Sequence, residues 1–158
     1  MPSICLPLSN KKTCTKVDAD VARWAKKMKW HVHKGYVAFT RGSGKEAKRY
    51  YLHRLLMASN TRLLVDHKNG DRLDNRRGNL RLATSSQNGA NVGKLNTNTS
   101  GFKGVVPHGD RFRAYIHLRG KTKYLGTFDD VRGAACAYDK AANKLFGRFA
   151  ATNRTGCE

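Results

Sequence analysis

The residues best able to do chemistry lie between positions 65 and 88, in a stretch rich in Asn, Gly and Asp. Asp66 and His67 are adjacent, Asn79 follows twelve residues later, and Asn88 nine residues after that. An imidazole with an ordinary pKa of about 6.5 can take a proton from water at neutral pH. Carboxylate and amide oxygens are the ligands that hard divalent cations prefer. A single histidine in a polar loop more often has no special role, so the surrounding pattern decides the interpretation.

The elements around these residues predict a hairpin followed by a helix. Residues 63–65 enter a strand, the polar loop turns the chain, residues 80–83 return, and Ser85 caps a short helix that carries Asn88. Neighbouring residues of a regular strand point to opposite faces. Asp66 and His67 therefore serve one site only if the strand ends or twists there, which the sequence of residues 68–70 permits.

This region resembles the HNH nucleases, and among them the ββα-metal or His-Me finger group found in phage and intron-type homing endonucleases. The resemblance is carried by L-H-R-L at 52–55 and by D-H-x-N-G-D-x-L-D-N-R-x-x-N-L-R-x-A-T at 66–84, with a further Asn at position 88. It implies that His67 is the general base and that Asn79 holds the loop and the backbone around His67. It also implies that Asp66 and Asn88 bind one divalent ion, Mg²⁺ or Mn²⁺, with no structural zinc.

The other polar residues of the region have simpler interpretations. His53 is expected to be a packing residue or one that faces a phosphate, rather than a second catalytic group. Four residues of the loop are predicted to be turn formers: Asn69, Asp71, Asp74 and Asn75. Four arginines either bind DNA phosphates or are simply solvated: Arg54, Arg76, Arg77 and Arg81.

The charge of the chain points to a polyanionic partner. Its 158 residues include 31 Lys and Arg against 11 Asp and Glu, a formal net charge of +20. Such an excess repels itself, and a nucleic acid relieves the repulsion while releasing its own counterions. No segment has the apolar length of a membrane span or the apolar face of a membrane-surface helix. We therefore expect a cytoplasmic protein that binds double-stranded DNA; a basic, soluble protein of unrelated function is the plain alternative.

The last third of the chain predicts a sheet packed on a helix. Strands are expected at 102–106, 111–118 and 122–128, followed by an Ala-rich helix over 129–146. In the second strand apolar residues alternate with Arg113, Tyr115 and His117, so one face is apolar and the other is basic and aromatic.

This part, residues 100–153, resembles an AP2 DNA-binding domain. The matching motifs are S-G-F-K-G-V at 100–105, Y-L-G-T-F-D at 124–129 and A-A-C-A-Y-D-K-A-A at 134–142. Such domains place the exposed face of their sheet in the major groove of DNA. Strand alternation predicts these reading positions: Lys103, Arg113, Tyr115, His117, Thr122 and Tyr124. The plant members' arginine-rich first strand is replaced by 106–108, so their target sequence does not carry over.

The first sixty residues are less informative. A helix is predicted over 16–28 and a hairpin over 30–40 with its turn at Lys34 and Gly35, whereas 50–57 is ambiguous between strand and helix. The region resembles the N-terminal part of phage nucleases through K-W-x-V at 29–32 and G-Y at 35–36. It either supports the nuclease or touches DNA.

Together these patterns predict an α+β chain with four parts: an N-terminal region 1–60, an HNH core 61–95, a linker 96–100 and an AP2-like domain 101–153. The predicted function is site-directed DNA cleavage of phage or mobile-element type, by a monomer or a dimer on DNA. A DNA-binding regulator that does not cleave is the main alternative. An RNA-binding role would require exposed aromatic residues for base stacking, in an order that this sequence lacks. The scattered cysteines Cys5, Cys14, Cys136 and Cys157 are expected to be free thiols in a reducing compartment.

Overall fold

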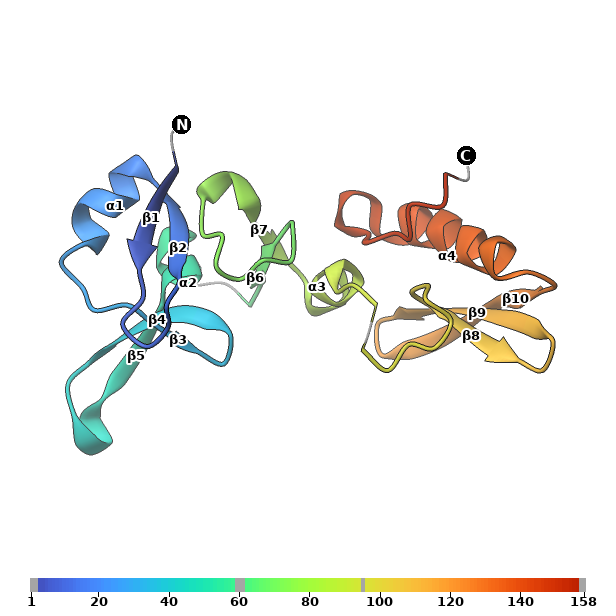
Figure 1. Cartoon of the computed structure of the whole chain (residues 1–158), viewed down its shortest axis with the longest axis horizontal. Coiled ribbons are helices and arrows are strands. Elements are labelled where there is room, and N and C mark those ends of the chain that lie inside the picture. Colours follow the sequence, from blue (N-terminus) through green and yellow to red (C-terminus); the bar gives the residue numbers. More distant parts are fainter. Residues whose placement is uncertain (1–2, 59–61, 95, 157–158) are drawn as a thin grey trace. The chain divides into compact units, whose positions relative to one another are not determined.

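The computed structural model describes residues 3–58, 62–94 and 96–156 (Figure 1). The chain is of mixed α and β structure, with small antiparallel sheets and short helices, as the sequence predicts. It forms two compact units, residues 1–83 and 84–158. Within the described residues, no helix is long and apolar enough to cross a membrane.

Unit 1 begins with a hairpin that the sequence did not suggest. Strand β1 (Ser3–Pro7) pairs antiparallel with β2 (Cys14–Asp18), and α1 (Ala19–Ala25) packs against both. The helix predicted from residue 16 therefore starts later, because residues 16–18 belong to the strand. Val17, Val21 and Ala25 are fully buried, so the apolar stripe of the expected helix is real but shorter.

The hairpin also corrects the prediction of free thiols. Antiparallel pairing of β1 and β2 brings the Cα atoms of Cys5 and Cys14 to 5.5 Å, and the two residues form a disulfide. Cys136 is disulfide-bonded as well, and Cys157 lies outside the described residues. The expectation failed because strand pairing, which no C-x-x-C spacing signals, brings the first pair together.

A second sheet of unit 1 has the order β3-β4-β5. Its strands are β3 (His31–His33), β4 (Tyr36–Arg41) and β5 (Lys48–Tyr51), and a 3-10 turn at Gly44–Glu46 joins the last two. Lys34 and Gly35 have positive φ angles of 49° and 82°, as the predicted hairpin turn requires. The ambiguous stretch 50–57 divides, because β5 ends at Tyr51 and α2 (Leu52–Leu56) follows at once.

The HNH-like part of unit 1 contributes a third, two-stranded sheet. Strand β6 (Leu64–His67) pairs antiparallel with β7 (Leu80–Ala83), and a 3-10 turn at Arg77–Asn79 precedes β7. The loop between the strands is tied to β2, since Lys16 N donates to the Leu73 carbonyl and Asn75 N to the Lys16 carbonyl. The N-terminal region thus supports the loop that follows His67.

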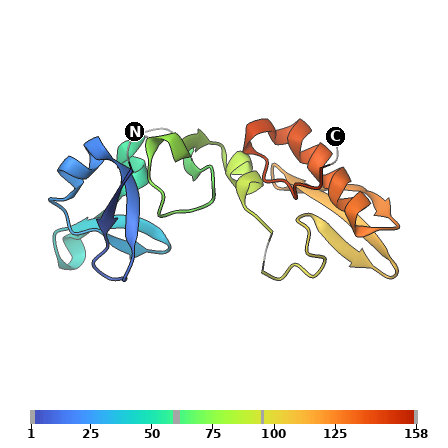
Figure 2. The same cartoon turned by 45° about the horizontal axis from the view of Figure 1, so that its top comes forward.

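Unit 2 contains the predicted sheet on a helix (Figure 2). Strands β8 (Val105–His108), β9 (Arg111–Leu118) and β10 (Lys121–Phe128) form the sheet in the order β10-β9-β8, and α4 (Val131–Phe146) packs on one face. A 3-10 turn at Gly147–Phe149 follows. Small residues at the contact, Ala114 and Ala134 among them, are fully buried and let the helix lie close to the strands.

The short helix α3 (Ser85–Asn91) belongs to unit 2. Its N-cap is Thr84, not Ser85 as predicted: the Thr84 hydroxyl accepts from Gln87 N while the Gln87 side chain accepts from Thr84 N. The helix packs against α4 and the turn at 147–149. The two units consequently divide at 83/84 and not in the linker expected at 96–100. The other expected boundaries fall at residues 60–61 and 95, which are outside the described ranges.

Candidate functional site

Asp66 and His67 lie at the end of strand β6, and both side chains are buried. The chain turns immediately after His67, where Gly70 N donates to the His67 carbonyl and Gly70 takes a φ angle of +76°. Lys68 N donates to the Asn79 carbonyl. Strand β6 thus ends at His67, and Asp66 and His67 are both still paired with β7 before the turn.

Asn79 connects the two ends of the loop that follows His67. Its Oδ1 accepts from Asn69 N at 3.2 Å, and its Nδ2 donates to Asn69 Oδ1 at 2.9 Å and to the Asp74 carbonyl at 2.8 Å. The side chain is buried. These three bonds hold the loop against β7 beside His67.

Asn75 contacts His67 directly, which its interpretation as a turn former missed. It is fully buried, its Nδ2 donates to Thr15 Oγ1 and to the Arg72 carbonyl, and its Oδ1 lies 3.4 Å from His67 Nε2. Because the amide nitrogen donates to two oxygens, Oδ1 is the acceptor, and neutral His67 carries its proton on Nε2. The lone pair of the imidazole is then on Nδ1.

The environment of His67 keeps the ring neutral. Burial lowers the pKa of His67 below its ordinary value, although the bond to Asn75 and the charge of Asp66 oppose the shift. His53, on α2, is buried with its ring centroid 5.5 Å from that of His67. Burial, and then repulsion from His67, lower the pKa of His53 to about 4. Both imidazoles are therefore neutral at neutral pH.

Asp66 is paired across the sheet with Arg81. The two residues face each other in the register of β6 and β7, and Arg81 Nε donates to Asp66 Oδ2 at 2.7 Å. The Arg81 side chain is only 10% exposed. The structure thus gives Arg81 a carboxylate partner in the free chain and places it in the interior rather than on an open DNA-binding surface.

Two further arginines of the loop also have carboxylate partners. Arg76 makes two bonds of 2.6–2.7 Å to buried Asp74, and these hold the pKa of Asp74 below its ordinary value. Arg77 bonds Asp20 at 2.7 Å, while its backbone N–H donates to Asp18. Asp74 is therefore part of the loop's internal structure, and Arg77 ties the loop to the N-terminal region.

Asn88 lies on α3 and hence in unit 2, whereas Asp66 and His67 lie in unit 1. Helix α3 is held within unit 2 by bonds from Lys103 Nζ and Ala151 N to the Ala90 carbonyl. The two predicted metal ligands therefore come from different units. Among the described residues, no group of three or more His, Cys, Asp and Glu side chains gathers to hold a metal ion.

The sheet of unit 2 presents five of the six predicted reading positions on one face, which we call the reading face: Arg113, Tyr115, His117, Thr122 and Tyr124. Tyr115 pairs with Tyr124 and His117 with Thr122 in the strand register, and α4 covers the opposite face. The rings of Tyr115 and Tyr124 are 5.5 Å apart, and His117 Nδ1 lies 3.2 Å from Thr122 Oγ1. Arg113 is half-buried, and its Nε has no hydrogen-bond partner within the described part of the chain.

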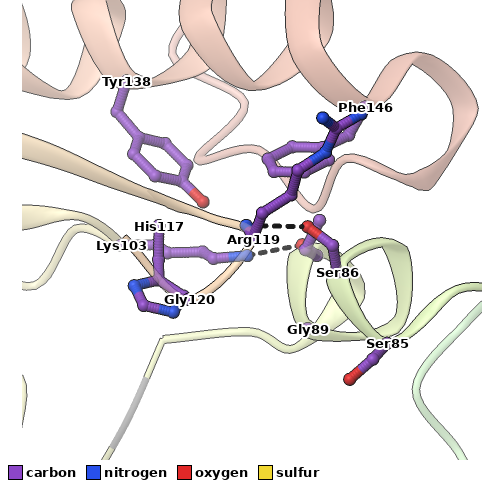
Figure 3. Close-up of a pocket in the computed structure, with 10 residues that line it drawn as sticks. Ser85, Ser86, Gly89, Lys103, His117, Arg119, Gly120, Tyr138 and Phe146 are labelled. Atoms are coloured by element: carbon purple, nitrogen blue, oxygen red, sulfur yellow. Dashed lines mark hydrogen bonds between the residues drawn. The ribbon is translucent and has the colours of Figure 1, made fainter. Parts of the chain in front are cut away.

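Lys103, the sixth predicted reading position, lies elsewhere (Figure 3). It precedes β8, and its side chain runs past the Tyr138 ring to the Ala90 carbonyl, which accepts from Nζ at 2.6 Å. Burial lowers the pKa of Lys103 to about 8. The side chain lines a cavity of about 470 Å³ between α3, α4 and the end of the sheet. Strand alternation misplaced it because Gly104, with a φ angle of +75°, breaks the strand before Val105.

Part of the chain is similar to known proteins. Residues 50–90 match the model of the HNH endonuclease family. An uncharacterized HNH endonuclease of Acanthamoeba polyphaga mimivirus is 29% identical over 130 residues, which are 81% of this chain and 68% of that protein. No solved structure is significantly similar.

Plant proteins match a second part. An AP2/ERF and B3 domain-containing protein of Oryza sativa subsp. japonica is 49% identical over 59 residues, which are 37% of this chain and 16% of that protein. An AP2/ERF and B3 domain-containing transcription repressor of Arabidopsis thaliana is 35% identical over 77 residues, 48% of this chain and 21% of its own length. The chain thus spans about a fifth of these plant relatives. Residues 50–90 are thus similar to the HNH endonuclease family, and the viral relative agrees with this match.

Proposed function

We propose that the protein is a metal-dependent DNA endonuclease whose unit 2 recognises the target DNA sequence. The observation that carries the proposal is His67 itself, a buried, neutral imidazole beside Asp66 at the end of β6, inside the region that matches the HNH family. The net charge of +20 and the reading face support DNA as the substrate. We propose Mg²⁺ or Mn²⁺ as the ion and double-stranded DNA as the form bound.

His67 acts as the general base in this mechanism. With its proton on Nε2 and bonded to Asn75, the imidazole takes a proton from the attacking water at Nδ1. Asn75 keeps the ring in this tautomer, and Asn79 keeps the loop in place. A base of lowered pKa is fully deprotonated at neutral pH and thus ready to accept.

The chemistry of the two ligands that we propose suits a hard divalent cation. Asp66 would offer a carboxylate whose Oδ2 is bonded to Arg81, and Asn88 would offer an amide oxygen. Two such oxygens leave room for water and for phosphate oxygens, as Mg²⁺ prefers. When bound, the ion supplies the charge that neutralises the leaving 3′ oxygen.

Relaxation of a supercoiled plasmid tests the activity. With Mg²⁺ or Mn²⁺ the plasmid should become nicked or linear, and with EDTA it should stay supercoiled. One active site in each chain makes a nick the expected first product. A protein that binds the plasmid but leaves it supercoiled in either metal would instead be a DNA-binding regulator.

Loss of either metal ligand should raise the metal requirement for cleavage. In Asp66→Asn the bond partner of Arg81 is kept while the charge is lost, and in Asn88→Ala the amide is lost. We expect each to need at least ~10-fold more Mg²⁺ for half-maximal cleavage, since a two-ligand site has little affinity to spare. Asn96→Ala, which removes an exposed amide, is the matched control and should behave as wild type. An unchanged requirement in the two ligand variants would show that other residues hold the ion.

Arg113→Ala should weaken discrimination more than binding. A side chain that contacts a base edge contributes about 1–3 kcal/mol of preference for the target over random DNA. Arg132→Ala, exposed on α4, is the control and should leave that preference unchanged. Affinities for selected and scrambled duplexes, measured at one salt concentration, give the comparison. Equal loss on both duplexes for Arg113→Ala would identify a phosphate contact, and the reading face would then not read sequence through this side chain.

A further inference from the structure

The face of the β3-β4-β5 sheet that points away from the core of unit 1 carries a run of basic and aromatic side chains. In the strand register, His33 pairs with Tyr36 and Ala38 pairs with Tyr51, so these side chains share one face with Arg49. The opposite face contributes Val32, Val37 and Phe39 to the core. We name the strip by six residues: His33, Tyr36, Arg49, Tyr51, Arg54 and Arg72.

The strip is continuous and ends at the candidate active site. Arg49 Nη1 lies 3.0 Å from His33 Nε2, and the His33 ring is 6.3 Å from that of Tyr51. The Tyr36 ring lies 6.2 Å from both Tyr51 and His67. Each step is a side-chain contact within unit 1, so a chain of ring contacts joins the exposed sheet face to the buried candidate base.

The three arginines of the strip differ from Arg76, Arg77 and Arg81 in their partners. Arg72 lies over the Tyr36 ring at 4.5 Å and Arg54 over the Tyr51 ring at 5.9 Å, so aromatic faces support both guanidinium groups. Arg49, Arg54 and Arg72 are exposed, and none of them pairs with a carboxylate among the described residues. Arg76, Arg77 and Arg81, by contrast, all have carboxylate partners.

The charge around the strip is of one sign. Residues 31–56 contain six Lys and Arg and a single acidic residue, Glu46. Like charges gathered on one face without acidic partners destabilise the free protein, and a polyanion removes that cost. Planar guanidinium groups held on ring faces suit phosphate oxygens in a fixed position.

We propose that this strip is the DNA-docking surface of unit 1, on which Arg49, Arg54 and Arg72 bind consecutive backbone phosphates of duplex DNA beside the scissile bond. The position beside the scissile bond rests on the proposed nuclease function, whereas DNA binding by the strip is independent of cleavage. It assigns the N-terminal residues a direct role in holding DNA, in addition to supporting the loop after His67. The tyrosines position arginines rather than stack on bases.

Salt dependence of binding in EDTA tests the strip without cleavage. In the full-length chain, Arg49→Ala, Arg54→Ala and Arg72→Ala together should flatten the slope of log affinity against log salt by about 3, since each phosphate contact contributes roughly 0.9. Replacing the same three residues by Lys keeps the charges and should restore most of the slope. The matched control combines Arg23→Ala, Lys26→Ala and Lys27→Ala, three exposed positions on and after α1, and should leave the slope near the wild-type value.

The outcomes separate docking from catalysis. A flattened slope in the strip variant but not in the control supports the strip, even for a wild-type protein that cuts no plasmid. An equal change in both variants, or none in either, overturns it, even for a protein that cuts well. Hydroxyl-radical footprints should show protection lost at one end of the wild-type footprint only. Equal affinity of the wild-type chain for duplex RNA of the same length would overturn DNA as the occupant.

Discussion

His67→Ala is expected to abolish plasmid cleavage while leaving DNA affinity nearly unchanged. Loss of a general base costs about 10²–10⁴ in rate, and His67 is buried, so it contributes little to the surface that meets phosphates. Single-turnover cleavage with protein in excess measures the rate, and binding in EDTA measures the affinity. His108→Ala removes an exposed histidine of unit 2 and should cleave as wild type does. Near-normal turnover of His67→Ala would remove the residue from the mechanism.

The titration of His67 provides an independent check. Burial disfavours the charged ring, so its folded pKa is lower than that of an unfolded histidine. The base should therefore take up its proton at a lower pH than an unfolded histidine does. Histidine ring resonances of the metal-free protein, followed by NMR, report the midpoint. A midpoint above the ordinary value would mean that nearby carboxylates outweigh burial, and the ring would then be partly charged at neutral pH.

Gly104→Ala should unfold unit 2. Gly104 has a φ angle of +75°, and an added Cβ would collide with the Tyr138 ring and come within 2.7 Å of the Tyr115 carbonyl oxygen. Overpacking against a buried ring and left-handed backbone strain together cost about 3–5 kcal/mol. That is most of the stability of a unit of this size, so thermal melting should show its transition lost or greatly lowered. Binding of target DNA should be lost with it.

Gly109→Ala is the matched control for this substitution. Gly109 also has a positive φ angle, +57°, but no heavy atom lies within 4 Å of its added Cβ. It carries only the backbone strain, about 1–2 kcal/mol, and unit 2 should stay folded at room temperature. If the two variants have the same melting temperature, the close contact between residue 104 and the Tyr138 ring is not the reason that a glycine is needed at position 104.

Much of the local structure could be predicted from the sequence, because it depends on neighbours in the chain. Alternation of apolar and polar residues predicted the two faces of β9, and Lys34-Gly35 predicted the turn between β3 and β4. The spacing of polar residues after β6 located Asp66, His67 and Asn79. Short-range periodicity failed where a strand replaced the start of a helix at residues 16–18, because pairing with β1 overrides helical preference there.

The partners of the site residues were decided by tertiary structure alone. Asn75 contacts His67 only because β2 supports the loop, with Thr15 accepting from Asn75 across 60 positions of sequence. Helix α2 places His53 beside His67. Nothing in the local sequence distinguishes such a residue from an ordinary turn former, since long-range packing selects its contacts.

The arginines also show that the sequence predicts one property and the tertiary structure decides another. The sequence by itself determined that the chain is strongly basic, and this charge predicts a polyanionic partner. It left Arg54, Arg76, Arg77 and Arg81 equivalent, because all four carry the same charge and nothing in the sequence names their partners. The fold separates them: carboxylates of the facing strand, of the loop and of α1 pair with Arg81, Arg76 and Arg77, respectively. Arg54 instead lies over the Tyr51 ring on an exposed face. Composition reports how much charge a chain has, and only packing decides which of that charge remains available to bind.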